Sequence, residues 1–271
     1  MNIDTKTASV ILAAGRGSRM KGYEGNKTIL PLIQGKSPYE GSRPILINII
    51  DSLPSGPKSV VVNYKKEDVM DVTHNLDITY CEQRVLNGTG GGLLAAHQFL
   101  EDQPCNQIII TMGDVPFVKR STYETLVKNL AGSSLVVLGF RPKSKKQYGI
   151  LEVEREKVRR IIEWKYWKSF TEDKQQSYRI CNSGIYAAKK DDLLKYLSVL
   201  ASRPHIVHKE INGKLREVEE FFVTDLVEYM NDDALTVSFV EVAHEEEVMG
   251  IDDLNALKKA REIFRARMLY A

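Results

Sequence analysis

Cysteine and histidine are scarce in this sequence of 271 residues. The three cysteines, Cys81, Cys105 and Cys181, are an odd number and show no CxxC spacing. They argue against a disulfide framework and favour buried thiols in a reducing cytosol, so we expect a cytoplasmic protein. The five histidines form no HExxH or HxxxH pattern, which argues against a histidine-based metal site.

Long apolar runs and an excess of charge are also missing. No run approaches the length that crosses a bilayer, and the N-terminal residues have no basic segment ahead of a long apolar one. We therefore expect neither a membrane span nor a secretory signal. The 38 basic and 36 acidic residues leave a net charge of +2. This near balance gives no support for a nucleic-acid or anionic-membrane surface.

Strand-length apolar runs alternate with helix-length amphipathic runs over about the first 145 residues. This rhythm predicts an α/β fold with a Rossmann-like, mixed but mostly parallel sheet and helices on both faces. The predicted strands are 7–13, 58–63, 78–81, 107–112 and 134–141, and the predicted helices are 44–53, 67–75, 93–101 and 122–131.

The rhythm changes from about residue 147 onward. We expect both halves, about 1–145 and 146–271, to share one sheet in a single domain, 1–271. Two polar segments, 34–43 and 165–177, are predicted to be surface loops and are candidates for lids. The second half is predicted to hold a hairpin at 148–153 and 157–164, strands at 179–188 and 235–242, and helices at 191–200, 222–230 and 253–269.

A glycine-rich loop, LAAGRGSRMKGYEGNK, follows the first predicted strand. In parallel sheets, ligands bind at the carboxyl ends of the strands, and glycine lets backbone N–H groups approach an anion. Gly15 and Gly17 meet half of the GxGxxG dinucleotide fingerprint, but Met20 takes the place of its third glycine. The Walker pattern fails because Asn26 precedes Lys27 where that pattern needs glycine. The loop is therefore either a different phosphate-binding loop or a solvated turn.

The charge of this loop favours phosphate binding. Arg19 can bind phosphate oxygens with two hydrogen bonds, and Lys27 supplies a point charge. Two cations added to backbone donors suit a triphosphate better than a single phosphate. Asp114, at the end of the apolar strand IIITM, is a candidate Mg²⁺ ligand or a turn-forming residue.

The loop LAAGRGSRM closely resembles the signature of the nucleotidyltransferases that activate sugar phosphates. The resemblance is strongest to the uridylyltransferase domain of N-acetylglucosamine-1-phosphate uridylyltransferase. It extends over roughly residues 8–258 and implies a nucleotide-diphospho-sugar transferase (GT-A-like) fold. Further stretches recur in the order of the family, namely NGTGGGLLAA, MGDVPFV, Tyr148-Gly149, Glu163, NSGIYAA, EFFVTDLVEYM and GIDDLNAL.

The resemblance implies a set of site residues. The reaction it implies joins a nucleoside triphosphate, UTP or dTTP, to a sugar 1-phosphate, with Mg²⁺ as cofactor. Nucleotide-binding roles fall on Leu12, Ala13, Ala14, Gly15, Gly17, Gln83, Gly88 and Thr89, and catalytic roles on Arg19 and Lys27. Acceptor-binding roles fall on Gly113, Tyr148, Gly149, Glu163, Lys165 and Asn182, and metal-binding roles on Asp114 and Asp252. Thr224 and Asp225 would help to shape the acceptor pocket.

Two alternatives stay open at this point. The chain could be a cytidylyl- or guanylyltransferase for a non-sugar phosphate, or a nucleotide-sugar-binding regulator without catalysis. We expect no acetyltransferase activity, because the sequence has no hexapeptide repeat. Relatives usually carry proline where Asn26 stands, so we expect Lys27 to lie on a looser loop that orders when substrate binds.

Overall fold

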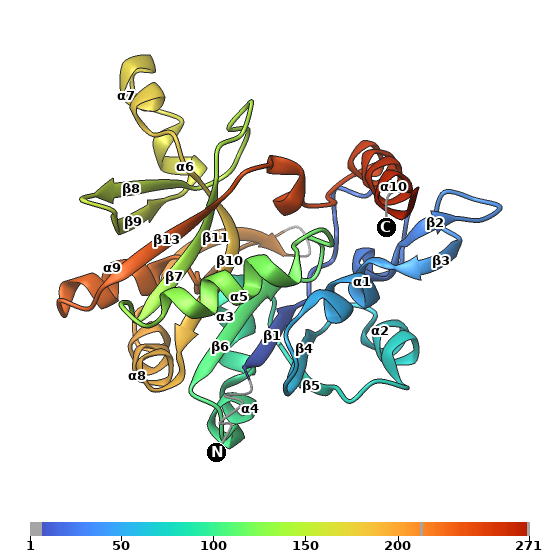
Figure 1. Ribbon diagram of the computed structural model, residues 1–271, viewed down its shortest axis with the longest axis horizontal. Helices are drawn as coiled ribbons and strands as arrows, with labels where there is room; N and C mark the ends of the chain where they lie inside the picture. Colours follow the sequence, from blue (N-terminus) through green and yellow to red (C-terminus); the bar gives the residue numbers. More distant parts are fainter. Residues whose placement is uncertain (1–6, 212–213, 270–271) are drawn as a thin grey trace.

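The computed structural model describes residues 7–211 and 214–269. Residues 1–6, on which the expectation about a secretory signal partly depends, lie outside this range. Within it, a nine-stranded sheet contains strands from both halves of the chain (Figure 1). These strands are β1 (Ala8–Leu12), β4 (Lys58–Val62), β5 (Thr79–Glu82), β6 (Gln107–Met112), β7 (Leu135–Phe140), β8 (Ile150–Glu154), β9 (Lys157–Ile162), β10 (Cys181–Lys189) and β13 (Val237–Val242).

The order of the strands is β5-β4-β1-β6-β10-β7-β13-β9-β8. The pairs β5–β4, β4–β1, β1–β6 and β7–β13 are parallel. The pairs of β10 with β6, β7 and β8, and of β9 with β8 and β13, are antiparallel. A mixed α/β sheet is confirmed, but the prediction that it is mostly parallel is wrong. Apolar runs report burial on both faces and carry no information about the direction of a strand.

Helices cover both faces of the sheet, and each face has its own apolar core. β6 shows how one strand serves both cores, because Ile109 packs in one and its neighbours Ile108 and Ile110 pack in the other. The first core also contains side chains of α1 (Ile45–Ser52), α2 (Lys66–Thr73), α5 (Arg120–Asn129) and α10 (Leu254–Leu269). The second contains side chains of α3 (Gly88–Ala95), α4 (His97–Asp102), α8 (Lys190–Ala201) and α9 (Asp225–Asp232).

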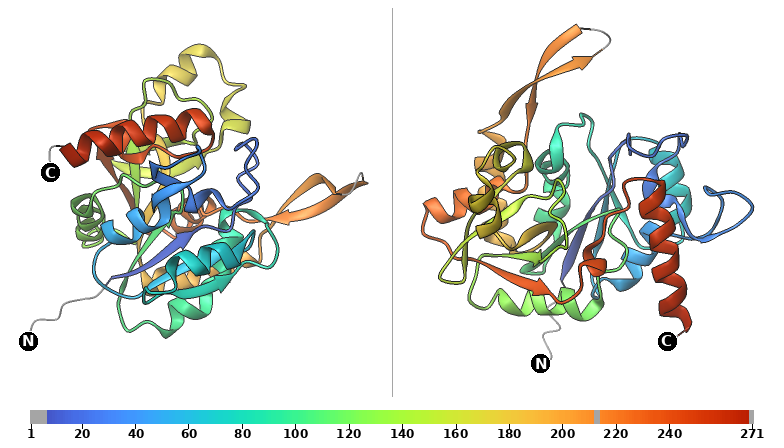
Figure 2. Two further views of the ribbon diagram at one scale, coloured as in Figure 1. Left: turned by 90° about the vertical axis from the view of Figure 1, so that its right-hand side faces the viewer. Right: turned by 90° about the horizontal axis from the view of Figure 1, so that it is seen from above.

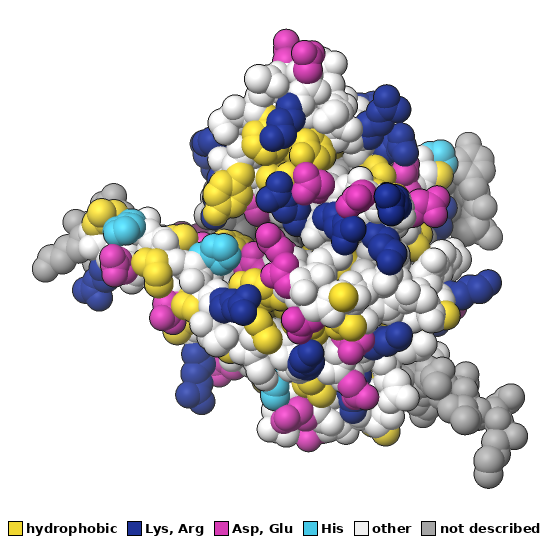
Figure 3. Space-filling model, turned by 90° about the vertical axis from the view of Figure 1, so that its left-hand side faces the viewer, with side chains coloured by type: hydrophobic (Ala, Val, Ile, Leu, Met, Phe, Trp, Pro, Cys, Tyr) yellow, Lys and Arg dark blue, Asp and Glu magenta, His cyan; other side chains and the backbone are white. Residues whose placement is uncertain are grey.

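Two small hairpins lie outside the main sheet. β2 (Pro31–Gln34) and β3 (Gly41–Pro44) form one of them, within the segment predicted to be a loop. β11 (His205–Ile211) and β12 (Lys214–Glu220) form the other, which the sequence analysis did not predict. Figure 2 shows this second hairpin as an arm that projects from the body of the molecule. Figure 3 shows charges of both signs interspersed over one face of the molecule, with the arm at the left edge of the view.

The polar segment 165–177 also differs from its prediction as a loop. It contains the short helices α6 (Trp164–Trp167) and α7 (Glu172–Ser177). Trp167 is buried in α6, and its indole donates to the carbonyl oxygen of Tyr148 at 2.9 Å. The segment thus supports a loop of the candidate site. No helix in the described ranges is long and apolar enough to cross a membrane.

Candidate active site

Met20 packs the loop after β1 against the core. Met20, at the position of the missing third glycine, is 3% exposed and packs in the core. Gly17 has a φ of 61°, and a Cβ atom at this position would lie 3.2 Å from the Cβ of Lys27. Gly17 is therefore needed for the turn and for the close passage of the Lys27 side chain. Gly15 is exposed on the loop and lines a pocket of about 1160 Å³. This pocket is called the larger pocket.

Asn26 fixes the segment that carries Lys27. It is fully buried, and its amide donates to the carbonyl oxygens of Ala13 at 3.2 Å and Tyr64 at 2.9 Å. Its Oδ1 accepts from the backbone N–H and the hydroxyl of Thr28 at 3.0 and 2.8 Å, and so caps the 3₁₀ helix η1 (Lys27–Ile29). The prediction of a looser loop is wrong, because four hydrogen bonds anchor this asparagine.

Two carboxylates that are distant in sequence converge on the Lys27 ammonium. The N–H of Ile251 donates to the carbonyl oxygen of Asp114 at 3.0 Å, which brings Asp252 beside the end of β6. Lys27 Nζ lies 2.5 Å from Asp114 Oδ2 and 2.8 Å from Asp252 Oδ1. Arg19 Nη2 lies 3.1 Å from Asp252 Oδ1, and its side chain is 67% exposed. The four charged residues predicted for catalysis and metal binding therefore form one cluster.

The cluster keeps Lys27 charged. Burial by itself would lower the pKa of Lys27, but the neighbouring carboxylates of Asp114 and Asp252 more than offset this, so the pKa is raised. Two carboxylates that reach one point also fit Mg²⁺, which binds one or two carboxylates together with substrate phosphates. No group of three or more His, Cys, Asp or Glu suited to a metal ion occurs in the described part of the chain. Other Mg²⁺ ligands would have to be water or substrate oxygens.

Gln83 lies in the larger pocket with its amide orientation fixed. It is 6% exposed, and its Nε2 donates to the carbonyl oxygen of Gly88 and to Asn87 Oδ1, both at 3.0 Å. Because a backbone carbonyl can only accept, the NH₂ group must point toward Gly88. The Oε1 atom is therefore left as a hydrogen-bond acceptor for a ligand in this pocket.

The glycine stretch after Asn87 forms the first turn of α3, so helical structure begins at Gly88 rather than at the predicted residue 93. The backbone of Phe221 packs directly on this turn, because Gly90 N–H donates to its carbonyl oxygen at 2.8 Å. A Cβ atom at Gly88 would lie 2.3 Å from the same oxygen. The group that closely approaches these glycines is therefore the backbone of this chain. Thr89 accepts from the N–H of Val223 at 3.2 Å, which ties α3 to the segment before α9.

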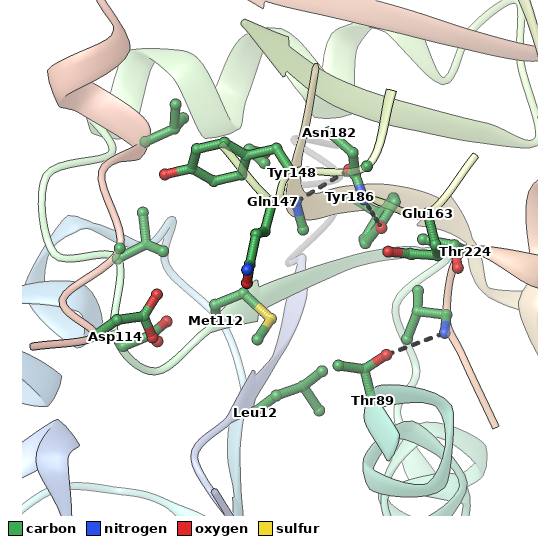
Figure 4. Close-up of a pocket in the computed structure, with 18 of the residues that line it drawn as sticks. Leu12, Thr89, Met112, Asp114, Gln147, Tyr148, Glu163, Asn182, Tyr186 and Thr224 are labelled. Carbon is green, nitrogen blue, oxygen red and sulfur yellow. Dashed lines mark hydrogen bonds between the residues drawn. The ribbon is translucent and has the colours of Figure 1, made fainter. Parts of the chain in front are cut away.

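A smaller pocket of about 240 Å³ opens beside the larger one. At the end away from Asp114 it is lined by Glu163, Asn182, Tyr186 and Thr224 (Figure 4). Because residues are shared, the two pockets meet in front of β1 and β6. The shared lining residues are Leu12, Arg19, Thr89, Met112 and Asp114.

Tyr148 and Gly149 form one wall of the smaller pocket. Tyr148 packs edge-on against Phe140, with ring centroids 4.9 Å apart. The Gly149 carbonyl oxygen accepts from the N–H of Asn182 at 2.8 Å. The N–H of Gly149 makes no hydrogen bond within the ranges that the structure covers, so it is free to donate to a ligand.

Two predicted acceptor-binding residues line neither pocket. Lys165 is exposed on α6, and its ammonium lies over the rings of Tyr166 and Phe222 at 4.8 and 5.1 Å from their centroids. Gly113 is buried, and its N–H donates to the carbonyl oxygen of Leu12 at 2.9 Å. Gly113 therefore holds the loop after β6 against the loop after β1.

The segment 34–43 is fixed by a buried arginine that the sequence analysis did not single out. Arg261 of α10 is 3% exposed and donates to the carbonyl oxygens of Pro31 at 3.0 Å and Pro38 at 2.6 Å. It also donates to Gln34 Oε1 at 3.0 Å. These three hydrogen bonds anchor the β2–β3 hairpin to α10. Such anchoring restrains the segment that was predicted to be a candidate lid. No local motif announces Arg261, because its partners are distant in sequence.

The fold is shared with solved nucleotidyltransferase structures. The UDP-N-acetylglucosamine pyrophosphorylase of Trypanosoma brucei superposes with a TM-score of 0.72 over 94% of this chain and 65% of that one, at 11% identity. A nucleotidyl transferase from Methanothermobacter thermautotroptrophicus superposes with a TM-score of 0.62 over 97% and 99% of the two chains, at 17% identity. At such identities the likeness concerns the fold.

The sequence matches the MobA-like NTP transferase domain over residues 9–215, and the chain belongs to this family. It is also 28% identical over 263 residues to the bifunctional protein GlmU of Buchnera aphidicola, a match that covers 96% of this chain and 51% of the relative. The chain thus spans about half the length of the curated relatives it matches. The resemblance to sugar-phosphate nucleotidyltransferases is confirmed.

Proposed function

We propose that this chain transfers a nucleotidyl group from a nucleoside triphosphate to the phosphate of a sugar 1-phosphate, with release of pyrophosphate. The observation that carries the proposal is the junction of the two pockets at Asp114. The larger pocket presents the glycine-rich loop, Arg19 and Lys27, whereas the smaller one presents hydrogen-bonding groups and a carboxylate. A triphosphate in one and a hydroxyl-rich phosphate in the other would meet where the charged cluster lies.

The reaction needs charge neutralisation more than proton transfer. A phosphate oxygen of the acceptor attacks the α-phosphorus, the bond from that phosphorus to the bridging oxygen breaks, and pyrophosphate leaves. The attacking oxygen is ionised at neutral pH, so no general base is required. Arg19 and the backbone near Gly15 would hold the outer phosphates, and Lys27 would balance the charge that develops at the α-phosphate. Such positioning and electrostatic stabilisation supply most of the catalysis in phosphoryl-type transfers.

Asp114 and Asp252 would hold Mg²⁺ in this scheme. The ion supplies neutralisation of the triphosphate charge when it is bound. Lys27 contacts both carboxylates here, so its ammonium would have to leave them for the α-phosphate when the metal binds. Gly17 leaves room beside the Lys27 side chain, and Asn26 keeps its backbone in place during this movement.

We infer that the base is uracil or thymine. Gln83 presents a fixed acceptor, which pairs with the imide N–H of these bases and opposes the acceptor nitrogen at the same position of cytosine. Gln83→Leu should therefore lower the ratio of kcat/KM for UTP over CTP by about 10–100-fold. The measurement is kcat/KM with each triphosphate, with the exposed Gln98→Leu of α4 as the control. A ratio unchanged in Gln83→Leu would remove Gln83 from base selection.

Glu163 should make acceptor use depend on pH. Burial raises the pKa of Glu163, although a hydrogen bond from Thr224 and the charge of Lys165 lower it in part. A carboxylate accepts hydroxyl protons only when ionised, so kcat/KM for the acceptor should fall as the pH drops through this raised pKa. The acidic limb should therefore lie above the ordinary value of 4.5 for glutamate.

Glu163→Gln should remove the part of that limb that belongs to Glu163, leaving the ionisation of the acceptor phosphate and an unchanged pH profile for the triphosphate. The exposed Glu154→Gln of β8 serves as the control, since it should keep the wild-type profile. An identical acidic limb in wild type and Glu163→Gln would show that another group titrates.

A screen for pyrophosphate release tests the proposed function. The enzyme is mixed with Mg²⁺, one of UTP, dTTP, CTP, ATP or GTP, and each member of a sugar 1-phosphate panel. Release with UTP or dTTP and a sugar phosphate is expected. Release only with CTP or GTP and a non-sugar phosphate would favour the cytidylyl- or guanylyltransferase alternative. Absence of turnover together with tight binding of a nucleotide sugar would favour a regulator.

A further inference from the structure

A turn inside β10 places a buried tyrosine at the wall of the smaller pocket. The pairing of β10 with β7 shifts register between Asn182 and Tyr186, and Gly184 in this interval has a φ of 80°. Asn182 Oδ1 accepts from the N–H of Gly184 at 3.0 Å, and Ser183 Oγ accepts from the N–H of Ile185 at 3.2 Å. The sequence NSGIY thus forms an irregular turn, a device that re-aims side chains beside ligand sites.

The direction of the hydrogen bond between Asn182 and Tyr186 is fixed by this turn. The Gly184 amide can only donate, so the Asn182 atom that it contacts must be the carbonyl oxygen. The other end of the Asn182 side chain is therefore the NH₂ group, which donates to Tyr186 Oη at 2.8 Å. Tyr186 Oη acts as the acceptor in this bond, and its own proton has to be donated elsewhere.

The described residues provide no acceptor for the Tyr186 proton. Tyr186 is 2% exposed, and it lines the smaller pocket. Burial raises the pKa of Tyr186, so the hydroxyl stays protonated at all pH values at which the protein would be assayed. A buried donor without a partner is costly, and such groups are rare in native proteins. The pocket is therefore the place where this proton finds an acceptor.

The neighbours of Tyr186 indicate what the acceptor is. Figure 4 shows Tyr186 beside Asn182 and close to Glu163, at the end of the pocket away from Asp114. Glu163, when ionised, can only accept a hydrogen bond, whereas Tyr186 offers a proton. A hydroxyl group accepts from one partner and donates to the other, while an ether or a methyl group cannot do both. The pair is thus complementary to a hydroxyl.

We propose that Tyr186 is a specificity-determining residue that donates its hydroxyl proton to a sugar hydroxyl of the acceptor, with Asn182 fixing its orientation. This inference rests on the proposed function and adds a donor to the acceptor site. The contact lies at the end of the pocket away from the charged cluster, so it should affect acceptor binding rather than the chemical step.

The test compares wild type and Tyr186→Phe with the preferred sugar 1-phosphate and with its monodeoxy analogues. Tyr186→Phe should raise KM for the acceptor about tenfold, as expected for one hydrogen bond to a buried group, with kcat and KM for the triphosphate unchanged. For one monodeoxy analogue, the KM of the wild type should also be about tenfold higher than its KM for the complete sugar 1-phosphate. With that analogue, the two enzymes should have the same KM, because the contact is already absent.

Tyr123→Phe is the matched control. Tyr123 is also fully buried and bonds a side-chain hydroxyl, that of Thr111 at 3.0 Å, but lines neither pocket. It should leave KM for the acceptor unchanged.

Each result decides between distinct conclusions. If the wild type turns over and Tyr186→Phe has the same KM for the acceptor, the inference is wrong and the proposed function stands. If the KM of Tyr186→Phe exceeds that of the wild type by the same factor for every monodeoxy analogue, Tyr186 supports the pocket without contacting a substrate hydroxyl. This result also overturns the inference. If Tyr186→Phe does not fold, the wild type alone still tests the inference. Equal KM values of the wild type for the sugar 1-phosphate and for all of its monodeoxy analogues would refute the inference. A wild type without turnover contradicts the proposed function and this inference together.

Discussion

Replacing Lys27 by methionine should lower kcat by about 10²–10³-fold, while KM for the triphosphate rises only a few-fold. The ammonium would act where charge develops in the transition state, whereas Arg19 and the loop backbone continue to bind the outer phosphates. Methionine keeps the length of the side chain that passes Gly17, so the loop should retain its structure. Steady-state kinetics over a triphosphate series gives both constants. An unchanged kcat would remove Lys27 from the chemistry.

Lys21→Met is the matched control for this variant. Lys21 belongs to the same loop but is exposed and lines neither pocket, so its loss should leave kcat near the wild-type value. A second readout does not depend on turnover. Lys27 Nζ contacts both carboxylates, so Lys27→Met should bind Mn²⁺ more tightly than the wild type in the absence of nucleotide. Weaker binding would show that the ammonium does not compete with the metal for Asp114 and Asp252.

Asp114→Asn should lower kcat on the order of 10²-fold or more and raise the Mg²⁺ concentration that gives half-maximal rate. The asparagine amide carries no negative charge at the point where the two carboxylates converge. This change weakens the binding of a hard cation such as Mg²⁺ more than it weakens a hydrogen bond at the same position. The Mg²⁺ dependence of the rate and Mn²⁺ titration followed by electron paramagnetic resonance are the measurements. Wild-type Mg²⁺ dependence in this variant would exclude Asp114 as a ligand.

Asp253→Asn controls for the loss of one carboxylate near the site. Asp253 adjoins Asp252 in sequence, but its Oδ1 accepts from the N–H of Ala256 at 2.8 Å, at the start of α10. Asparagine can also cap a helix, so this variant should keep its fold and its Mg²⁺ dependence. A defect as large as that of Asp114→Asn would point to general electrostatics rather than to metal binding.

Much of the fold could be predicted because apolar runs of two lengths alternate along the chain. The strands β1, β4, β6 and β7 lie close to their predicted positions, since their side chains are buried on both faces. The direction of β10 was not predictable, because an antiparallel strand covered on both faces has the same composition as a parallel one. The β11–β12 arm was missed although Asn212-Gly213, between two alternating runs, is a hairpin signal in the sequence.

Some residues of the candidate site could also be predicted from the sequence, whereas others could not. Arg19, Lys27 and Asp114 could be identified because they lie in glycine-containing segments that follow apolar strands, where a parallel sheet binds ligands. Asp252 needed the family resemblance, since its partner lies 138 positions earlier in the chain. Tyr186 was missed because a tyrosine in the run GIYAA is typical of a core strand. Its role depends on the turn at Gly184, and that turn becomes visible only when β10 is paired with its neighbours.

Phosphorus-31 nuclear magnetic resonance of the wild-type reaction tests the central claim most directly. The sample contains the enzyme, Mg²⁺, UTP or dTTP, and the sugar 1-phosphate that the screen identifies. The account predicts that the signal of the acceptor phosphate disappears, and that the signals of a nucleoside diphosphate sugar and of pyrophosphate appear in equal amounts. Formation of orthophosphate and a nucleoside diphosphate, with the acceptor phosphate unchanged, would contradict it and show hydrolysis rather than nucleotidyl transfer.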